Sequence, residues 1–150
     1  MVRVFFAVEP AAEIREAVAA AGAQLKASSA RLGLVDASLM HITLKFLGEV
    51  PESGIPQLSA VLQNLHSAPY ELTVRHVDAF GRPPRVIKAD IRDGGASAAL
   101  AGRIDALTAS LGIPGDTKPF SPHITIARVR EYAPDLHPIL AELRSREFGT

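Results

Sequence analysis

Apolar positions along the chain recur in two patterns. In some segments they stand at every second position or in short runs rich in Val, Ile and Phe, which is typical of strands. In others they recur every three to four residues, which is typical of amphipathic helices. The first pattern predicts strands over Val2–Val8, Leu32–Val35, Leu39–Phe46, Glu71–Phe80, Arg85–Ile91 and Ser121–Arg130. The second predicts helices over Ala11–Ser28, Ile55–Leu65, Ala96–Leu111 and Asp135–Arg146, with Asp135 as the N-cap of the last.

The order of the predicted elements indicates the fold class. Long helical crossovers separate the strands, which favours an α+β or α/β arrangement over a sandwich. A chain of 150 residues that is 47% apolar is long enough for one globular core or for two small lobes. The sequence has no clear domain linker, and the corner at Gly81–Pro84 is the only change of composition that is a candidate for a boundary between lobes.

Charge and cysteine content narrow the functional classes. The 16 basic and 16 acidic residues cancel, which argues against a protein that holds nucleic acid non-specifically through many phosphate contacts. The absence of cysteine excludes disulfides, thiolate metal sites and a cysteine nucleophile, and it fits a reducing compartment. The apolar run Val4–Val8 is too short for a signal sequence or a membrane-spanning helix, so we expect a cytoplasmic protein without a membrane partner.

One four-residue pattern, His-Ile-Thr followed by an aliphatic residue, occurs twice in predicted strands, at 41–44 and at 123–126. Chance gives roughly 0.2 His-x-Thr matches in a chain of this composition. Because side chains alternate across a strand, His41 and Thr43 share one face, and His123 and Thr125 do the same on theirs. If the two strands are neighbours or pseudo-symmetric mates, two imidazoles and two hydroxyls converge.

Such a set of groups suits attack on a phosphodiester without a metal. One histidine accepts a proton near neutral pH while the other donates one, and threonine hydroxyls donate hydrogen bonds to phosphoryl oxygens. A two-histidine metal site is an alternative, but no carboxylate accompanies either motif at ligand spacing. A single His-x-Thr on a strand is most often a satisfied surface pair, and the second copy is what favours function.

The two motifs, extended to His41–Val50 and Pro122–Arg128, resemble the paired motifs of the two-histidine phosphoesterases. Within that superfamily the resemblance is to the RNA 2′,3′-cyclic phosphodiesterases, also called 2′-5′ RNA ligase-like proteins. Three further segments are similar to the family, Arg3–Pro10, Ala79–Val86 and Glu147–Gly149, so the resemblance covers nearly the whole chain.

The resemblance implies an α+β fold of two pseudo-symmetric lobes, each an antiparallel sheet with outer helices, around a central cleft. It implies that His41 is the proton donor, that His123 is the proton acceptor, and that Thr43, Thr125 and Arg128 bind the phosphate. The implied reaction is cofactor-free hydrolysis of RNA 2′,3′-cyclic phosphate ends, single-stranded or tRNA-derived, or of nucleoside 2′,3′-cyclic phosphates, to 2′-phosphomonoesters. Reversible 2′-5′ joining of RNA ends also belongs to the family, and no obligate protein partner is indicated.

Arg128 and Phe120 have two interpretations each, and Lys45 has one. Simple alternation places Arg128 on the isoleucine face, so it reaches the phosphate only if the strand bulges near Ala127; otherwise it is a solvent-facing arginine. Lys45 shares the parity of His41 and is expected at the cleft. Phe120 either stacks on a base or packs in the core.

Family members continue past the segment that corresponds to Phe148, so we expect residues 1–150 to form one two-lobed domain that lacks a C-terminal strand segment.

Two other functions remain open at this point. The same groups suit a non-catalytic module that binds RNA ends, or a two-histidine phosphoesterase that acts on a small cyclic or 2′-5′ nucleotide. Turnover of a nucleoside 2′,3′-cyclic phosphate separates the first from the enzyme, and a comparison of nucleotides with oligoribonucleotides separates the second.

Overall fold

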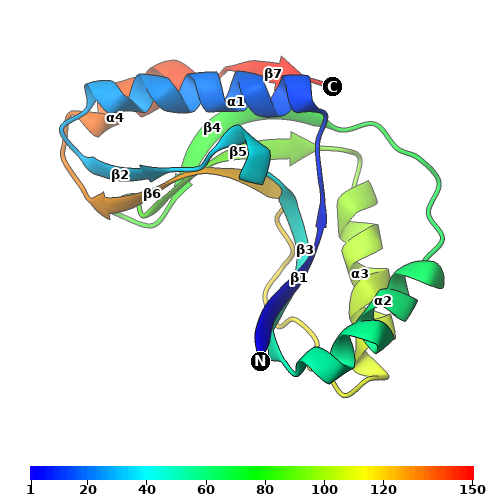
Figure 1. The fold of residues 1–150 in the computed structure, drawn as a ribbon. Helices are drawn as coiled ribbons and strands as arrows, with labels where there is room; N and C mark the ends of the chain where they lie inside the picture. Colours follow the sequence, from blue (N-terminus) through cyan, green and yellow to red (C-terminus); the bar gives the residue numbers. More distant parts are fainter. The chain divides into compact units, whose positions relative to one another are not determined.

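The computed structural model describes all 150 residues and is a mixed α+β structure (Figure 1). Its strands are β1 (Val2–Val8), β2 (Arg31–Leu34), β3 (Ile42–Val50), β4 (Thr73–Phe80), β5 (Val86–Arg92), β6 (His123–Glu131) and β7 (Glu147–Gly149). Its α-helices are α1 (Ala12–Gln24), α2 (Ile55–Gln63), α3 (Ala96–Ala109) and α4 (Leu136–Leu143). The predicted α+β class is confirmed, and each predicted helix and strand has a counterpart here. No helix combines the length and the apolar character that a membrane crossing requires.

The chain divides into two compact units, each made of three segments. Unit 1 contains Met1–Val8, Thr43–Tyr70 and Asp93–Pro122, and unit 2 contains Glu9–Ile42, Glu71–Arg92 and His123–Thr150. The Gly81–Pro84 corner lies inside unit 2, where it connects β4 to β5. The composition change at this corner is therefore a turn between paired strands and not a boundary between lobes.

Unit 1 combines the paired strands β1 and β3 with helices α2 and α3. Its core is a cluster of buried apolar side chains from all four elements: Phe6, Leu44, Leu58, Val61, Leu100, Ala101 and Ile104. The helices contribute because their apolar residues recur at three- and four-residue spacing, which puts them on one stripe. The strands contribute because alternate residues face the same side.

Unit 2 contains an antiparallel sheet in the order β6, β5, β4 and β7, with β2 paired to β6. Helices α1 and α4 cover one face of this sheet (Figure 1). The buried face of α1 follows helical spacing through Ile14, Val18 and Ala21. Gly22 lies on the same buried face, where an added Cβ would stand 2.9 Å from Cγ2 of Ile126, so a residue without a side chain lets α1 approach β6 closely.

One local expectation is confirmed in position only, and another is wrong. Asp135 is the N-cap residue of α4, as expected, but its side chain makes no capping hydrogen bond. Its carboxylate instead accepts hydrogen bonds from the Ser28 hydroxyl and the Ser29 backbone N–H, each at 2.8 Å, and so fastens the start of α4 to the segment after α1. The strand predicted to close before Gly48 continues to Val50, because Gly48 adopts a positive φ of 71° within the strand.

Candidate active site

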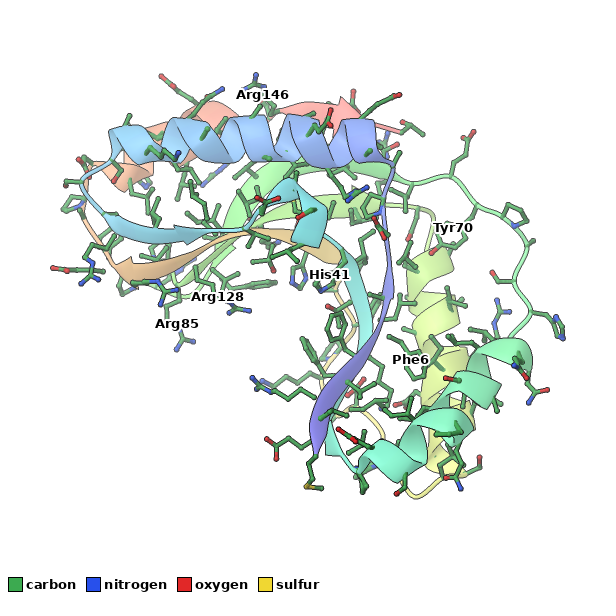
Figure 2. The ribbon with its side chains drawn as sticks, in the orientation of Figure 1. Phe6, His41, Tyr70, Arg85, Arg128 and Arg146 are labelled. Carbon is green, nitrogen blue, oxygen red and sulfur yellow. The ribbon has the colours of Figure 1, made fainter.

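The pairing of Ile42 with Ile124 brings the first two residues of each histidine motif together in unit 2. Ile42 and Ile124 are antiparallel partners and both are fully buried, which fixes the side of the sheet that each strand turns to the core. If this register is continued by one residue, His41 stands opposite Thr125. His123 is then the diagonal neighbour of His41, and such diagonal residues of paired strands are about 7–8 Å apart. Figure 2 shows His41 on the side of the sheet away from α1.

The hydrogen bond of His41 identifies the nitrogen that exchanges protons. Nδ1 lies 2.7 Å from the backbone carbonyl of Leu39. A carbonyl oxygen accepts and never donates, so Nδ1 carries a proton in both forms of the ring. Nε2 is therefore the nitrogen that gains and loses the second proton, which is the arrangement a proton-transfer residue needs.

His123 lies beside an aromatic ring and an ion pair whose ammonium is largely buried. Its ring and the Phe80 ring form a T-shaped contact, with the centroids 5.1 Å apart and the planes at 79°. The Lys88 ammonium lies 4.8 Å from the centroid of the same Phe80 ring and forms an ion pair with Asp90. The sequence analysis did not assign Phe80, Lys88 or Asp90 to the site. The polar residues on either side of Ala89 were nevertheless a signal, because they indicate one polar face within a strand.

The register of β5 with β6 explains where Arg128 points. Ile87 pairs with Ala127 and Lys88 pairs with Thr125, so β6 has one extra residue, Ile126. This bulge reverses the alternation, and Arg128 therefore returns to the face of Thr125. Figure 2 shows Arg128 on the side of the sheet away from α1, as it shows His41. The bulge that the sequence required for Arg128 to share the histidine face is present.

The two motifs share an exposure pattern that extends beyond the repeated tetrad. Positions 41–49 and positions 123–131 have the same succession of buried, half-buried and exposed residues at all nine places. In both, two consecutive residues are buried: Leu44 and Lys45 in the first, Ile126 and Ala127 in the second. The repeat therefore includes the break in alternation as well as the chemistry-bearing residues.

This break in alternation corrects the expectation for Lys45. Its side chain is 1% exposed, and Nζ lies 2.5 Å from Asp105 Oδ1 and 3.1 Å from the Pro114 carbonyl oxygen. The hydrogen bond from Lys45 is the main reason that the pKa of Asp105 lies below its usual value. Phe46, which simple alternation places in the core, is instead 68% exposed and packs beside Phe5 at 5.7 Å between centroids.

The remaining predicted residues lie in unit 1. Thr43 is half-buried on β3, directly after Ile42. Phe120 packs against the apolar cluster of that unit, which is the core alternative of its two interpretations. No group of three or more His, Cys, Asp or Glu side chains is arranged to hold a metal ion.

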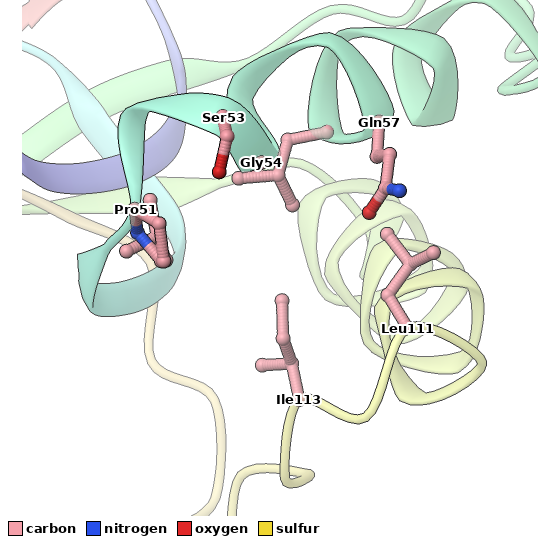
Figure 3. Close-up of a pocket in the computed structure, with 8 residues that line it drawn as sticks. Pro51, Ser53, Gly54, Gln57, Leu111 and Ile113 are labelled. Atoms are coloured by element: carbon pink, nitrogen blue, oxygen red, sulfur yellow. The ribbon is translucent and has the colours of Figure 1, made fainter.

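Unit 1 also has an open pocket of about 350 Å³ at the start of α2 (Figure 3). The residues that line it are Val50, Pro51, Ser53, Gly54, Gln57, Leu58, Leu111 and Ile113. The lining contains no titratable side chain and none of the predicted site residues.

Comparisons with known proteins identify a family for the chain. A family model described as LigT-like phosphoesterase matches residues 8–88 and 94–150. A curated protein of Archaeoglobus fulgidus, named RNA 2′,3′-cyclic phosphodiesterase, is 32% identical over 149 residues, which is 98% of this chain and 84% of that protein.

Solved structures of similar proteins have the same fold as this chain. A crystal structure of a Thermus thermophilus protein superposes with a TM-score of 0.82 at 31% identity, over 99% of this chain and 82% of that one. The structure of Escherichia coli LigT in complex with 3′-AMP superposes with a TM-score of 0.72 at 30% identity, over 87% of this chain and 75% of that one. The chain is thus similar to these proteins in sequence and in fold.

Proposed function

This chain belongs to the LigT-like phosphoesterase family, and from that membership we propose that it hydrolyses RNA 2′,3′-cyclic phosphate ends to 2′-phosphomonoesters. The single observation that supports the proposal is the antiparallel pairing of Ile42 with Ile124. Continuing this register by one residue puts His41 opposite Thr125 and diagonal to His123. Relatives named RNA 2′,3′-cyclic phosphodiesterase align over most of the chain, which supports the same substrate class here.

The proposed reaction needs one proton acceptor and one proton donor. His123 takes a proton from water, whose oxygen attacks phosphorus and forms the new P–O bond. The P–O3′ bond breaks, and His41 gives its Nε2 proton to the departing O3′, so the phosphate remains on O2′. The Nδ1 hydrogen bond to Leu39 supports this role for His41, because it holds the ring in one orientation through the proton transfer.

Phosphate binding is assigned to hydroxyls and one cation. Thr125 is half-buried on the histidine face, and the bulge at Ile126 returns Arg128 to that face. A guanidinium binds two phosphoryl oxygens at once, which stabilises the charge that develops during attack. Thr43, the equivalent of Thr125 in the first motif, completes the proposed set.

The proposal includes a second reaction, the joining of RNA ends, and two conditions. If the 5′-hydroxyl of an RNA replaces water, the same proton transfers join the ends through a 2′-5′ bond. The acid and base are both imidazoles, so we propose that no metal or other cofactor takes part. With RNA ends as substrate, we place the activity in the cytoplasm, in keeping with a chain that contains no cysteine.

Phosphorus NMR of the reaction with a nucleoside 2′,3′-cyclic phosphate tests the proposal. We expect a 2′-phosphomonoester, and we expect His41→Ala and His123→Ala to lower turnover by about 10²–10⁴-fold each. His66→Ala is the matched control, because that exposed histidine lies outside both motifs. A 3′-phosphate product would mean that the substrate is bound in the reversed orientation, and binding without turnover would indicate a non-catalytic RNA-end module.

A further inference from the structure

The histidine face of unit 2 contains a charge pair that the proposed reaction does not use. The Lys88 side chain is 10% exposed, and its ammonium forms an ion pair with the Asp90 carboxylate, whose side chain is 37% exposed. Both are on β5, two residues apart, so they project from the same side of the strand. A largely buried ammonium needs such a partner, because an unpaired charge away from water is costly.

The β5–β6 register places this pair directly beside the second motif. Asp90 is the cross-strand partner of His123, and Lys88 is the cross-strand partner of Thr125. Directly opposed residues of antiparallel strands have Cβ atoms about 4.5–5.5 Å apart, so the Asp90 carboxylate lies within reach of the His123 imidazole, and Lys88 is the diagonal neighbour of His123 at about 7–8 Å. Phe80 joins the two groups, since its ring contacts the His123 ring and lies under the Lys88 ammonium.

Other charged groups share this face and are unchanged in every variant. The second strand away, β4, presents Arg75 opposite Asp90 and Asp78 opposite Lys88. Further groups are Arg128 and Arg130 on β6 and His41 at the start of β3, and Figure 2 shows Arg85 on the same side. Of these positions, Asp90 is the one that the register sets opposite His123.

We propose that Lys88 and Asp90 are positioning residues whose opposite charges compensate each other and so set the pH range in which His123 accepts a proton. The catalytic part of this proposal rests on the proposed role of His123. Each charge alone has a definite effect on an adjacent imidazole, because a carboxylate favours the imidazolium and an ammonium disfavours it. Paired, the two effects largely cancel, and both the imidazole and the ammonium contact the Phe80 ring.

Removing one charge at a time therefore moves the protonation of His123 in opposite directions. Lys88→Met keeps an unbranched side chain on Phe80 and leaves Asp90 uncompensated, so His123 stays protonated to higher pH. Asp90→Asn leaves Lys88 uncompensated, so His123 loses its proton at lower pH. The double variant Lys88→Met/Asp90→Asn restores a neutral surrounding. We expect single shifts of roughly one pH unit and a double variant near the unmodified protein.

The experiment is an NMR pH titration of the histidine rings, run beside the pH dependence of turnover. The His123 signals are identified by their absence in His123→Ala, and the titration needs no substrate. Glu131→Gln is the control, because it removes a carboxylate from β6 that is exposed and paired with Arg31 at 4.0 Å. In the rate profile, the acid limb should move up in Lys88→Met and down in Asp90→Asn, with Glu131→Gln unchanged.

Each outcome decides something different. Opposite shifts in the titration support the charge pair even if turnover is absent, and in that case the proposed function fails while the electrostatic coupling stands. Shifts in the same direction, or none larger than in Glu131→Gln, overturn the inference even if the protein is an active phosphodiesterase. If Lys88→Met does not fold, Asp90→Asn compared with the double variant still tests the sign.

Discussion

The close approach of α1 to β6 predicts that two chemically identical substitutions have opposite effects on stability. Gly22 in α1 is buried, and an alanine Cβ there would stand 2.9 Å from Cγ2 of Ile126. Gly102 lies within α3, is exposed and has no atom within 4 Å of the same position. Both glycines are helical, so alanine gains about 1 kcal/mol of helix propensity at either.

The difference between the two variants isolates the packing cost. Cγ2 is bonded to the Ile126 Cβ and cannot swing away as the end of a long side chain does, so the backbone or the helix must shift. Overpacking of this kind costs about 1–3 kcal/mol. Gly102→Ala should thus stabilise the protein by about 0.5–1 kcal/mol, while Gly22→Ala should be less stable than Gly102→Ala by about 1–3 kcal/mol.

Urea unfolding of both variants measures this difference. With a slope of about 2 kcal/mol per molar urea, a 2 kcal/mol difference separates the midpoints by roughly 1 M. Replacing Ile126 by Leu removes the branch at Cβ, so Gly22→Ala should cost less in an Ile126→Leu background than alone. Equal midpoints for Gly22→Ala and Gly102→Ala would refute the close packing of α1 on the bulge.

Three further predictions concern the site, its cofactors and acid stability. Arg128→Ala should lower kcat/KM by about 10–100-fold through loss of a charge-assisted phosphate contact, while Arg146→Ala, on the other side of the sheet in Figure 2, should not change it; equal loss in both would contradict the placement. Turnover should survive dialysis against a strong chelator, and restoration by added zinc or manganese after a loss would contradict the metal-free proposal. Hydrogen bonds from the Ser29 N–H and the Ser28 hydroxyl lower the pKa of Asp135. Its carboxylate therefore stabilises the fold above its ordinary value of 3.8, and this stabilisation is lost as pH falls from there through the lowered pKa. The urea midpoint of Asp135→Asn should accordingly fall less steeply with acid than that of the unmodified protein, and parallel curves would count against this linkage.

The sequence predicted the side of the sheet on which the motif residues lie, because two-residue alternation is a property of any strand. It placed Ile42 and Ile124 in the core, and both are fully buried. The two-residue alternation gave the wrong side for Lys45, because Leu44 and Lys45 are both buried although they are consecutive in β3. Neither residue type indicates that the alternation is interrupted there. The equivalent break in β6 is what returns Arg128 to the histidine face, and the sequence indicated only that one was needed.

The charge pair beside His123 shows a second limit. Neither the spacing of Lys88 and Asp90 nor their types indicate which strand they face, because that depends on a register set by the bulge at Ile126. The division into units is similarly a property of contacts among segments far apart in sequence, and composition at Gly81–Pro84 carried no information about it.

The central claim is that His41 gives a proton to the departing O3′ while His123 takes one from water. A nucleoside cyclic phosphorothiolate with sulfur in place of O3′ tests it directly, because a thiolate leaves without protonation. With this substrate, His41→Ala should recover to within about tenfold of the unmodified protein, since the general acid is no longer needed, and His123→Ala should stay impaired. Recovery of His123→Ala instead of His41→Ala would contradict the assignment of donor and acceptor, and recovery of neither would contradict acid catalysis by this pair.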